Sequence, residues 1–421
     1  MRKIYSLLLY IFIPIALIHL LWRSIKTPSY RQRIQERFGI IPKLSCNKSI
    51  WIHAASVGEV QASIPLIEYF LHHHSQFITV VTTTTPTGSH RIQQLFNSRI
   101  YHCYIPYDIP LAIRSFIRSI KPQLAIFIET EVWPNILHEC KHQHIHTVLA
   151  NARLSKKSVH GYAKLGNFAR DTFNNFTHIA AQTDADAERL LQLGVKSELI
   201  TIIGNIKFDL QLTPKLYSQA SMIKEMWGKK RPIWIAASTH EGEDELLLDA
   251  HKSVLTSIPN AILMLVPRHP ERFNRVAQLI IQQGFNLIRR SEQRPCNVNT
   301  QVILGDSMGE LTMLFATVDV AFIGGSLTPH GGHNVLEAAA LKKPIIIGPY
   351  VMNFLAIANE LLMIGAAKQI NTVNELAEIV ITWLSDKNLR EDIGNRGYAL
   401  IEKNRGAIDK LINVLSKFCN L

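Results

Sequence analysis

The sequence contains little cysteine, and the cysteines it has do not form a recognisable site. Its five cysteines, at positions 46, 103, 140, 296 and 419, are scattered and include no CxxC pair. An odd, dispersed set argues against a disulfide framework or a thiolate metal site and favours a reducing compartment. The histidines at 138, 142, 144 and 146 lack HExxH spacing, so we predict that they lie on a solvated surface and bind no metal.

Acidic residues are scarce near the N-terminus. Residues 1–43 contain eight Lys or Arg but only Glu36, a net charge of +7 within a formal +12 for the whole chain. No recognised nucleic-acid-binding motif accompanies them. Because the basic residues flank an apolar segment, we predict anionic lipid as the partner of this region, and no nucleic acid.

That apolar segment, Ile4 to Trp22, has no cleavage site of the small-x-small type after it. Its 19 residues would extend roughly 28 Å as a helix, close to the ~30 Å of a bilayer core. We predict a membrane anchor over residues 1–26, with the more basic C-terminal side in the cytoplasm. Pro14 and His19 leave open a helix that lies in the interface. In both cases we expect the body of the protein to be cytoplasmic and held against a membrane.

No low-complexity stretch interrupts the rest, and 421 residues exceed the usual size of one domain. Apolar runs alternate with amphipathic segments, which predicts parallel sheets with right-handed crossovers. We predict an N-terminal α/β domain over 27–205, a C-terminal one over 206–400, and a helix over 401–421 that packs back on the first. The strands expected in the first domain are 50–54, 77–81, 102–105, 124–128, 147–150, 178–181 and 199–203. Those expected in the second are 233–237, 262–266, 302–304, 320–323 and 344–347, followed by helices over 375–384 and 408–418.

Ligands of such sheets bind at the carboxyl ends of the strands, where several polar residues of the first domain fall. Glu59 begins a helix after the first strand and suits a general base, although a capping glutamate would occupy the same place. Glu129 and Glu131 follow the fourth strand, where a buried carboxylate without a role is costly. Lys207 lies at the expected domain boundary, as a ligand of the cleft or as a solvated linker lysine.

In the second domain, Arg268 follows a strand, which suits a phosphate ligand. The segment 319–341 contains a strand, a glycine-bearing loop and a helix expected to open near His333 and Asn334. Asn334 suits an N-cap, and Glu337 could accept hydrogen bonds from a ribose or a base. This pattern predicts a nucleotide-phosphate cradle; the alternative is a turn whose glycines serve close packing.

Read together, these segments resemble the lipid A-specific 3-deoxy-D-manno-octulosonic acid (Kdo) transferases, glycosyltransferase family 30, over nearly the whole chain. The resemblance is carried by nine motifs in order: WIHAASVGEV (51–60), TTTTPTGS (82–89), ETEVWPN (129–135), NARLS (151–155), GNIKFD (204–209), ASTHEGE (237–243), LVPRHPERF (265–273), GDSMGEL (305–311) and GGSLTPHGGHNVLEAAA (324–340).

The resemblance implies a GT-B fold of two Rossmann-like domains at the inner membrane. It also implies an inverting transfer of Kdo from CMP-Kdo to the lipid A precursor, with no metal and no cofactor. It implies that Glu59 is the base and that Glu129 and Lys207 stabilise the transition state. The implied CMP contacts are Pro267, Arg268, Met308, Gly309, Glu310, Asn334, Val335, Leu336 and Glu337. At Val335 the family often has proline, and we keep the position because a backbone contact is expected there.

Two alternatives differ in chemistry. One is another GT-B glycosyltransferase that uses a UDP-sugar. The other is a membrane-tethered nucleotide-binding protein without catalysis, against which the intact Glu59, Glu129, Lys207 and Arg268 argue.

Overall fold

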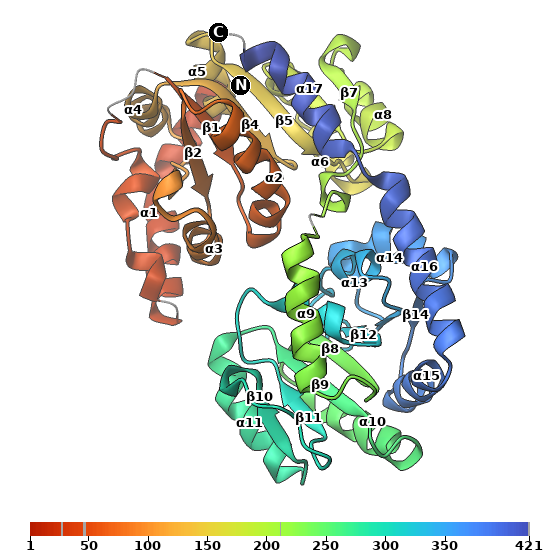
Figure 1. The fold of residues 1–421 in the computed structure, drawn as a ribbon. Coiled ribbons are helices and arrows are strands. Elements are labelled where there is room, and N and C mark those ends of the chain that lie inside the picture. Colours follow the sequence, from red (N-terminus) through yellow and green to blue (C-terminus); the bar gives the residue numbers. More distant parts are fainter. Residues whose placement is uncertain (27, 45–47, 211, 420–421) are drawn as a thin grey trace. The chain divides into compact units, whose positions relative to one another are not determined.

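The computed structural model describes residues 1–26, 28–44, 48–210 and 212–419, and these form two compact units (Figure 1). Unit 1 consists of Met1–Asp209 with Arg405–Leu421, and unit 2 of Leu210–Asn404. The division falls at Asp209 rather than at residue 205, because the Asp209 carboxylate accepts the backbone N–H groups of Gly406 (2.7 Å) and Ile408 (2.6 Å). Lys207, expected at the start of the second domain, therefore belongs to unit 1.

Unit 1 contains sheet 1, whose seven strands are all parallel and include every strand expected there. They are β1 (Ser49–His53), β2 (Ile78–Thr83), β3 (Tyr101–Tyr104), β4 (Pro122–Ile128), β5 (His146–Ala152), β6 (His178–Ala181) and β7 (Ile200–Ile202). Their order is β3-β2-β1-β4-β5-β6-β7. Because β1 and β4 are neighbours, the order reverses between them.

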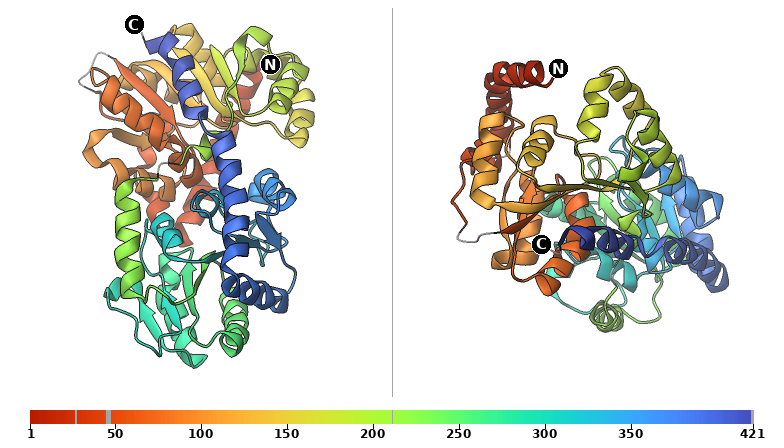
Figure 2. Two further views of the ribbon diagram at one scale, coloured as in Figure 1. Left: turned by 45° about the vertical axis from the view of Figure 1, so that its right-hand side comes forward. Right: turned by 90° about the horizontal axis from the view of Figure 1, so that it is seen from above.

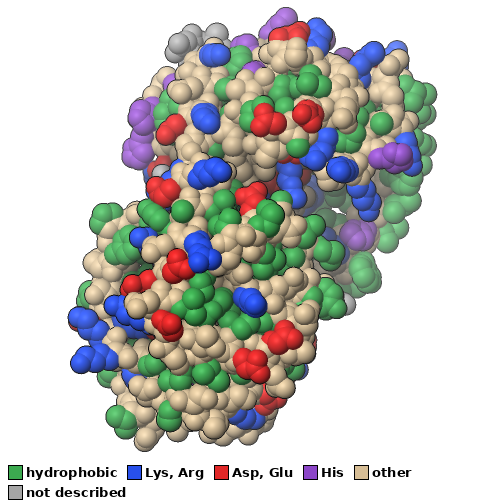
Figure 3. Space-filling view, turned by 90° about the vertical axis from the view of Figure 1, so that its right-hand side faces the viewer, with side chains coloured by type: hydrophobic (Ala, Val, Ile, Leu, Met, Phe, Trp, Pro, Cys, Tyr) green, Lys and Arg blue, Asp and Glu red, His purple; other side chains and the backbone are tan. Residues whose placement is uncertain are grey.

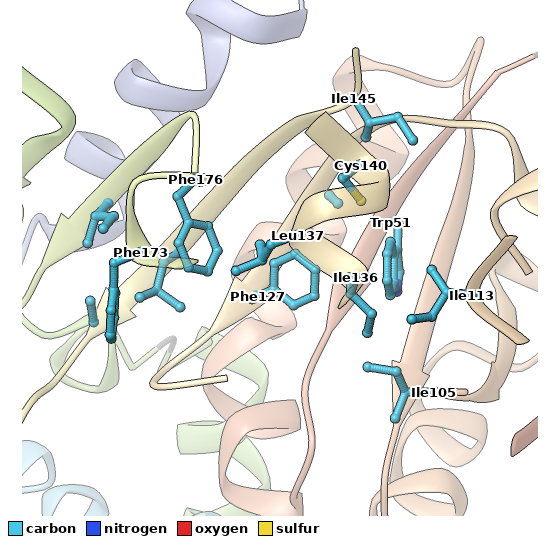
Figure 4. Close-up of a cluster of buried hydrophobic side chains, with 14 of the residues drawn as sticks. Trp51, Ile105, Ile113, Phe127, Ile136, Leu137, Cys140, Ile145, Phe173 and Phe176 are labelled. Carbon is cyan, nitrogen blue, oxygen red and sulfur yellow. The ribbon is translucent and has the colours of Figure 1, made fainter. Parts of the chain in front are cut away.

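The α-helices of unit 1 are α1 (Arg2–Lys26), α2 (Val57–His73), α3 (Pro86–Phe96), α4 (Pro110–Ile120), α5 (Pro134–His142), α6 (Lys156–Ala163), α7 (Asn167–Phe173), α8 (Asp184–Gln192) and α17 (Ala407–Cys419). Helices cover both faces of sheet 1, whereas α1 packs against α5. Alternate residues of β1 face opposite layers, as a pleated strand requires: Trp51 enters one buried cluster, and Ile50 and Ile52 enter the other. Figure 4 shows the first cluster, where the Trp51 ring packs edge-on against Phe127 with centroids 5.2 Å apart.

The C-terminal helix α17 belongs to the second of these clusters. Ile408, Leu411 and Leu415 pack there against residues of α2 and the central strands, and the view from above in Figure 2 shows the helix on this layer. This apolar contact and the bonds of Asp209 attach the end of the chain to unit 1.

Helix α1 also packs on unit 1 near its N-terminal end. The Tyr5 hydroxyl donates to the Asp108 carboxylate (2.9 Å), and the Ser6 hydroxyl donates to Asn135 (2.9 Å). The segment Arg2–Ile25 is long and apolar enough to cross a membrane, with only 6% of its most apolar window buried in the protein. A row of exposed side chains results: Leu7, Leu8, Ile11, Phe12, Ile15, Ile18, Leu21, Trp22 and Ile25.

Unit 2 contains sheet 2, again of seven parallel strands. They are β8 (Ile233–Thr239), β9 (Ile262–Pro267), β10 (Leu287–Arg289), β11 (Val302–Leu304), β12 (Val320–Ile323), β13 (Ile345–Ile347) and β14 (Ala367–Gln369). The order is β10-β11-β9-β8-β12-β13-β14, which reverses between β8 and β12. The five expected strands are confirmed, and β10 and β14 are additional strands at the two edges.

The helices of unit 2 are α9 (Pro214–Met226), α10 (Asp244–Ser257), α11 (Phe273–Gln282), α12 (Leu311–Thr317), α13 (Leu336–Ala340), α14 (Leu355–Met363), α15 (Val373–Ser385) and α16 (Lys387–Asn404). The expected helices near 375–384 and 408–418 are confirmed as α15 and α17, and α16 was not expected. The core of unit 2 includes Trp234, Phe322 and Ile346 from the strands, and Leu247 and Val380 from α10 and α15.

Candidate active site

The predicted catalytic residues of unit 1 lie where the strand order of sheet 1 reverses. Glu59 is in the first turn of α2, directly after β1, and Glu129 directly follows β4. Because β1 and β4 are adjacent and parallel, their carboxyl ends lie side by side. This is the place where open parallel sheets bind ligands.

Glu59 is held by its own helix end. Ser56 caps α2, and the Glu59 carboxylate accepts the Ala55 backbone N–H (2.7 Å) and the Ser56 hydroxyl (2.9 Å). Burial raises the pKa of Glu59 to about 7, and the nearby charge of Glu129 adds to the rise, while the two hydrogen bonds oppose it. Glu59 is thus a capping glutamate and also a carboxylate that exchanges its proton near neutral pH.

Glu129 forms an ion pair with Lys207, so the structure brings these two predicted residues together. Glu129 has a φ of 63°, in the left-handed region that is unfavourable for a side chain of its size. The ion pair and the Glu129 backbone N–H bond to the Ala150 carbonyl (2.8 Å) hold this conformation. Lys207 is therefore a partner of the site rather than a solvated linker residue.

Asn151 positions Lys207, a role that the sequence did not reveal. Asn151 is fully buried at the end of β5 with a φ of 59°, and its side-chain oxygen accepts the Ile206 backbone N–H (3.1 Å). Asn205 accepts the Lys207 backbone N–H (3.0 Å). The short helix η5 (Ile206–Phe208) is thereby fixed against sheet 1. The signal in the sequence for this positioning role was Asn151, a polar residue directly after the expected apolar strand 147–150.

The second carboxylate after β4 has structural partners. Glu131 accepts the Trp133 indole N–H (2.8 Å) and lies 3.7 Å from Nε2 of the buried His53. It also contributes to the raised pKa of Glu59. The charge of Glu131 therefore acts on the pKa of Glu59 without a direct contact. His53, which lies beside Glu131, is a residue that the sequence analysis did not single out.

In unit 2, Arg268 follows Pro267, the last residue of β9, and its side chain is half-buried. The guanidinium donates no hydrogen bond to any residue within the described ranges. Burial lowers the pKa of Arg268, and the charge of Glu337 opposes that change. A desolvated cation without a hydrogen-bond acceptor is suited to bind an anion.

The segment expected to form the cradle differs in its helix. Helix α13 begins at Leu336 rather than near His333 and Asn334, and it has only five residues. Asn334 is not its N-cap; its oxygen accepts the Leu336 backbone N–H (3.1 Å), and its amide donates to Glu337 (3.2 Å). Glu337 also accepts the Thr312 hydroxyl. The helix starts late because this local turn competes with the first helical bonds.

The neighbouring positions of the predicted CMP set differ in what they can offer a ligand. The side chains of Val335 (2% exposed) and Leu336 (0%) lie in the core, so only their backbone groups can reach a ligand. Gly324 makes a close approach, since a Cβ there would meet the Ser238 carbonyl oxygen at 2.6 Å. Gly324 therefore serves close packing, as the alternative interpretation expects, and the nucleotide cradle stays a prediction.

The third part of the predicted set lies in the loop between β11 and α12. Gly309 has a φ of 81°, Met308 is exposed, and Glu310 forms an ion pair with Arg290 (2.9 Å). The loops after β9, β11 and β12 all leave the carboxyl edge of sheet 2. The structure thus places the predicted CMP residues along one edge of unit 2. Sequence analysis did not find His240, His269 and His330, which lie on the same edge.

Comparison with known proteins identifies relatives for both units. Residues 32–210 match a family model described as 3-deoxy-D-manno-octulosonic-acid transferase (kdotransferase), and residues 236–400 match one described as glycosyl transferases group 1. The 3-deoxy-D-manno-octulosonic acid transferase of Haemophilus influenzae is 43% identical over 420 residues, covering 99% of this chain and 98% of that protein. That of Rickettsia bellii is 30% identical over 421 residues, covering 99% and 100%.

Solved structures resemble the fold. The UDP-GlcNAc 2-epimerase from Neisseria meningitidis bound to UDP-GlcNAc has a TM-score of 0.60 at 14% identity, covering 88% of this chain and 100% of that one. Anabaena Alr3699/HepE in complex with UDP has a TM-score of 0.55 at 15% identity, with the same coverage. These likenesses concern the fold alone, and together with the two seven-stranded parallel sheets they confirm the predicted GT-B class.

Proposed function

The chain belongs to the 3-deoxy-D-manno-octulosonic acid transferases, and we propose the reaction that its residues carry out. In this proposal the enzyme moves Kdo from CMP-Kdo to a hydroxyl of the lipid A precursor lipid IVA, in lipopolysaccharide core biosynthesis. The transfer is a single displacement that inverts the anomeric centre and uses no metal ion.

Glu59 is the base in this proposal. The acceptor hydroxyl must lose its proton as it attacks C2 of Kdo, and a base is most effective when its pKa lies near the working pH. Burial and Glu129 raise the pKa of Glu59 to about 7, so a substantial fraction is ionised in a neutral cytoplasm. The single observation that carries the proposal is a carboxylate with a pKa near 7, placed where the strand order of sheet 1 reverses.

Glu129 and Lys207 stabilise the transition state. C2 of Kdo bears a carboxylate and has no neighbouring hydroxyl, so bond breaking runs ahead and positive charge develops on the ring. The Glu129 carboxylate suits that charge, and Lys207 orients this carboxylate through the ion pair. The strained backbone of Glu129 supports a functional role, because such conformations cluster at active sites.

Unit 2 binds the donor through its nucleotide. CMP leaves as a phosphate monoester, and the half-buried guanidinium of Arg268 is suited to the charge that builds on it. Glu337 is oriented by Asn334 and Thr312, so its carboxylate can accept a hydroxyl or amino group of the cytidine. Backbone groups of Val335 and Leu336 complete the proposed contacts.

Helix α1 holds the enzyme on the cytoplasmic leaflet by lying in it. A helix of 25 residues that crossed the bilayer would place its first turn roughly 30 Å or more from the cytoplasmic body. Tyr5 and Ser6, in that turn, instead bond to Asp108 and Asn135 of the body. The exposed apolar row then enters the leaflet, and Arg23, Arg31 and Lys43, all exposed, can meet anionic headgroups. In the upper part of Figure 3, which is unit 1, hydrophobic side chains run along the right-hand edge beside Lys and Arg.

The decisive experiment is a transfer assay with purified protein in detergent or vesicles, in the presence of EDTA. CMP-Kdo, UDP-glucose and UDP-GlcNAc are each supplied with lipid IVA, and the lipid product is identified by mass spectrometry. The proposal expects Kdo-modified lipid from CMP-Kdo alone. Transfer from a UDP-sugar, or no transfer without added metal, would contradict it.

A further inference from the structure

Four histidines of unit 2 meet where the strand order of sheet 2 reverses. His240 follows β8, His269 follows β9, and His330 and His333 lie in the loop between β12 and α13. The His240 ring stacks on His330 with 4.0 Å between centroids, and it lies parallel to the His333 ring with centroids 5.0 Å apart. The His269 ring meets His240 edge-on at 5.5 Å. We call these four residues the histidine cluster.

A buried carboxylate holds the backbone around the cluster. Glu243, which is 0% exposed, accepts the backbone N–H groups of His240 (2.9 Å), Gly325 (2.7 Å) and Leu327 (3.0 Å). Gly325 has a φ of 69°, and a Cβ there would come within 3.1 Å of the His333 ring. The rings are therefore held in place before any ligand arrives, which lowers the cost of binding.

The cluster is not arranged as a metal site. Nε2 of His240 and Nε2 of His333 are 2.7 Å apart. Two nitrogens bound to one tetrahedral zinc ion at ~2.1 Å would be separated by roughly 3.4 Å. At 2.7 Å one nitrogen donates a hydrogen bond and the other accepts it. The neutral accepting ring therefore has its own proton on Nδ1. Neither Nδ1 has a hydrogen-bond partner among the residues that the structure describes, so that N–H can bind an outside acceptor.

The charges around the cluster leave Arg268 as a cation with no hydrogen-bonded partner within the described ranges. Arg272 is paired with Asp244, and Glu243 is engaged by backbone groups. Burial lowers the pKa of His333 to about 3, with Arg268 adding to the effect, and lowers that of His240 to about 4. Both rings are therefore neutral at pH 7 and act as hydrogen-bond donors and acceptors beside one guanidinium. The other charged groups on these loops are Glu241, paired with Arg275, and Glu271, both exposed.

These features suit a second anionic group next to the phosphate. In CMP-Kdo the carboxylate and the phosphate oxygen are attached to the same carbon, so a site that holds the phosphate has the carboxylate within a few ångströms. We propose that the histidine cluster, beside Arg268, binds the carboxylate of the donor sugar. This inference rests on the proposed function and adds the residues that separate CMP-Kdo from CMP and from neutral sugar nucleotides. A site built to hydrogen-bond one group discriminates strongly against a ligand without it.

The test compares the affinities of CMP-Kdo and CMP, without acceptor, by displacement of a fluorescent cytidine nucleotide. His333→Phe keeps a flat ring at this position and removes both nitrogens, and His330→Phe does the same at the exposed position that stacks on His240. His142→Phe, an exposed histidine of unit 1, is the matched control. We expect His333→Phe to weaken CMP-Kdo about tenfold and CMP less than twofold, a smaller loss of CMP-Kdo in His330→Phe, and no change in the control.

Retained CMP binding shows that a variant is folded, so misfolding cannot imitate the expected result. Equal losses of CMP and CMP-Kdo would assign the cluster to the nucleotide and overturn the inference. Unchanged CMP-Kdo affinity in both cluster variants would also overturn it. A wild-type protein that binds CMP but gains nothing from the sugar in CMP-Kdo would instead count against the proposed function.

Discussion

Replacing Glu59 by glutamine tests the proposed base through a single proton. The change keeps the size of the side chain and an oxygen that can accept the Ala55 N–H, but it removes the ionisable group. Positioned bases contribute about 10²–10⁴-fold, so we expect turnover to fall at least ~100-fold. CMP affinity should stay near normal, because Glu59 belongs to unit 1 and the predicted CMP residues to unit 2.

The raised pKa adds a dependence on pH. With a pKa of about 7, Glu59 is mostly protonated at pH 6 and mostly ionised at pH 8. Wild-type kcat/KM should therefore fall below pH 7, with a slope of one on a logarithmic plot, while the residual activity of Glu59→Gln should lack that limb. Initial rates with CMP-Kdo and lipid IVA from pH 5.5 to 9 measure both.

Stability provides an independent check of the same pKa. Since the folded pKa of Glu59 lies above its usual 4.5, folding is penalised as the pH rises from 4.5 to 7, and the penalty is complete above 7. Glu59→Gln should therefore raise the melting temperature more at pH 8 than at pH 5. A variant with near-normal turnover, or with an unchanged acid limb, would refute the role of Glu59.

Three further predictions concern the supporting residues. Glu337→Ala should weaken CMP binding about tenfold by calorimetry, since a charged hydrogen-bond acceptor is lost, and unchanged affinity would move the nucleotide elsewhere. Asn151→Ala removes the acceptor of the Ile206 N–H and so loosens Lys207. It should lower kcat more than it changes KM for CMP-Kdo, and it should cost about 1–3 kcal/mol of stability. A normal kcat would contradict the positioning role of Asn151. A cysteine at the exposed position 3 (Lys3→Cys) should bind more of a membrane-impermeant thiol reagent than the wild-type protein in inverted vesicles and not in spheroplasts, whereas the opposite pattern would mean that α1 spans the bilayer.

Sequence reasoning succeeded where apolar periodicity decided the structure. The central strands of both sheets are continuous buried runs. Of the catalytic candidates, Glu59 lies in the first turn of the helix after β1, and Glu129 directly follows β4. It failed at the sheet edges. Strand β14 reads Ala-Lys-Gln with two exposed residues, and β10 has only three partly buried residues, so neither has an apolar signal.

Other features depend on contacts that no local pattern specifies. Lys207 was assigned to the second domain because its link to unit 1, through Asn151 and Asp209, joins residues far apart in the chain. Helix α16 carries polar residues along much of its length and two buried glycines, which weaken its helical pattern. The histidine cluster is assembled from three separate loops, so only the folded sheet brings its rings together. The thiols of Cys103, Cys140 and Cys296 are free; Cys46 lies outside the described residues, as does the side chain of Cys419.

The most direct measurement of the central claim is the anomeric configuration of Kdo in the lipid product, determined by NMR with carbon-13-labelled CMP-Kdo and EDTA-treated enzyme. A single displacement in which Glu59 activates the acceptor hydroxyl predicts a product whose configuration at C2 is opposite to that of the donor. A product with the donor's configuration would contradict this mechanism.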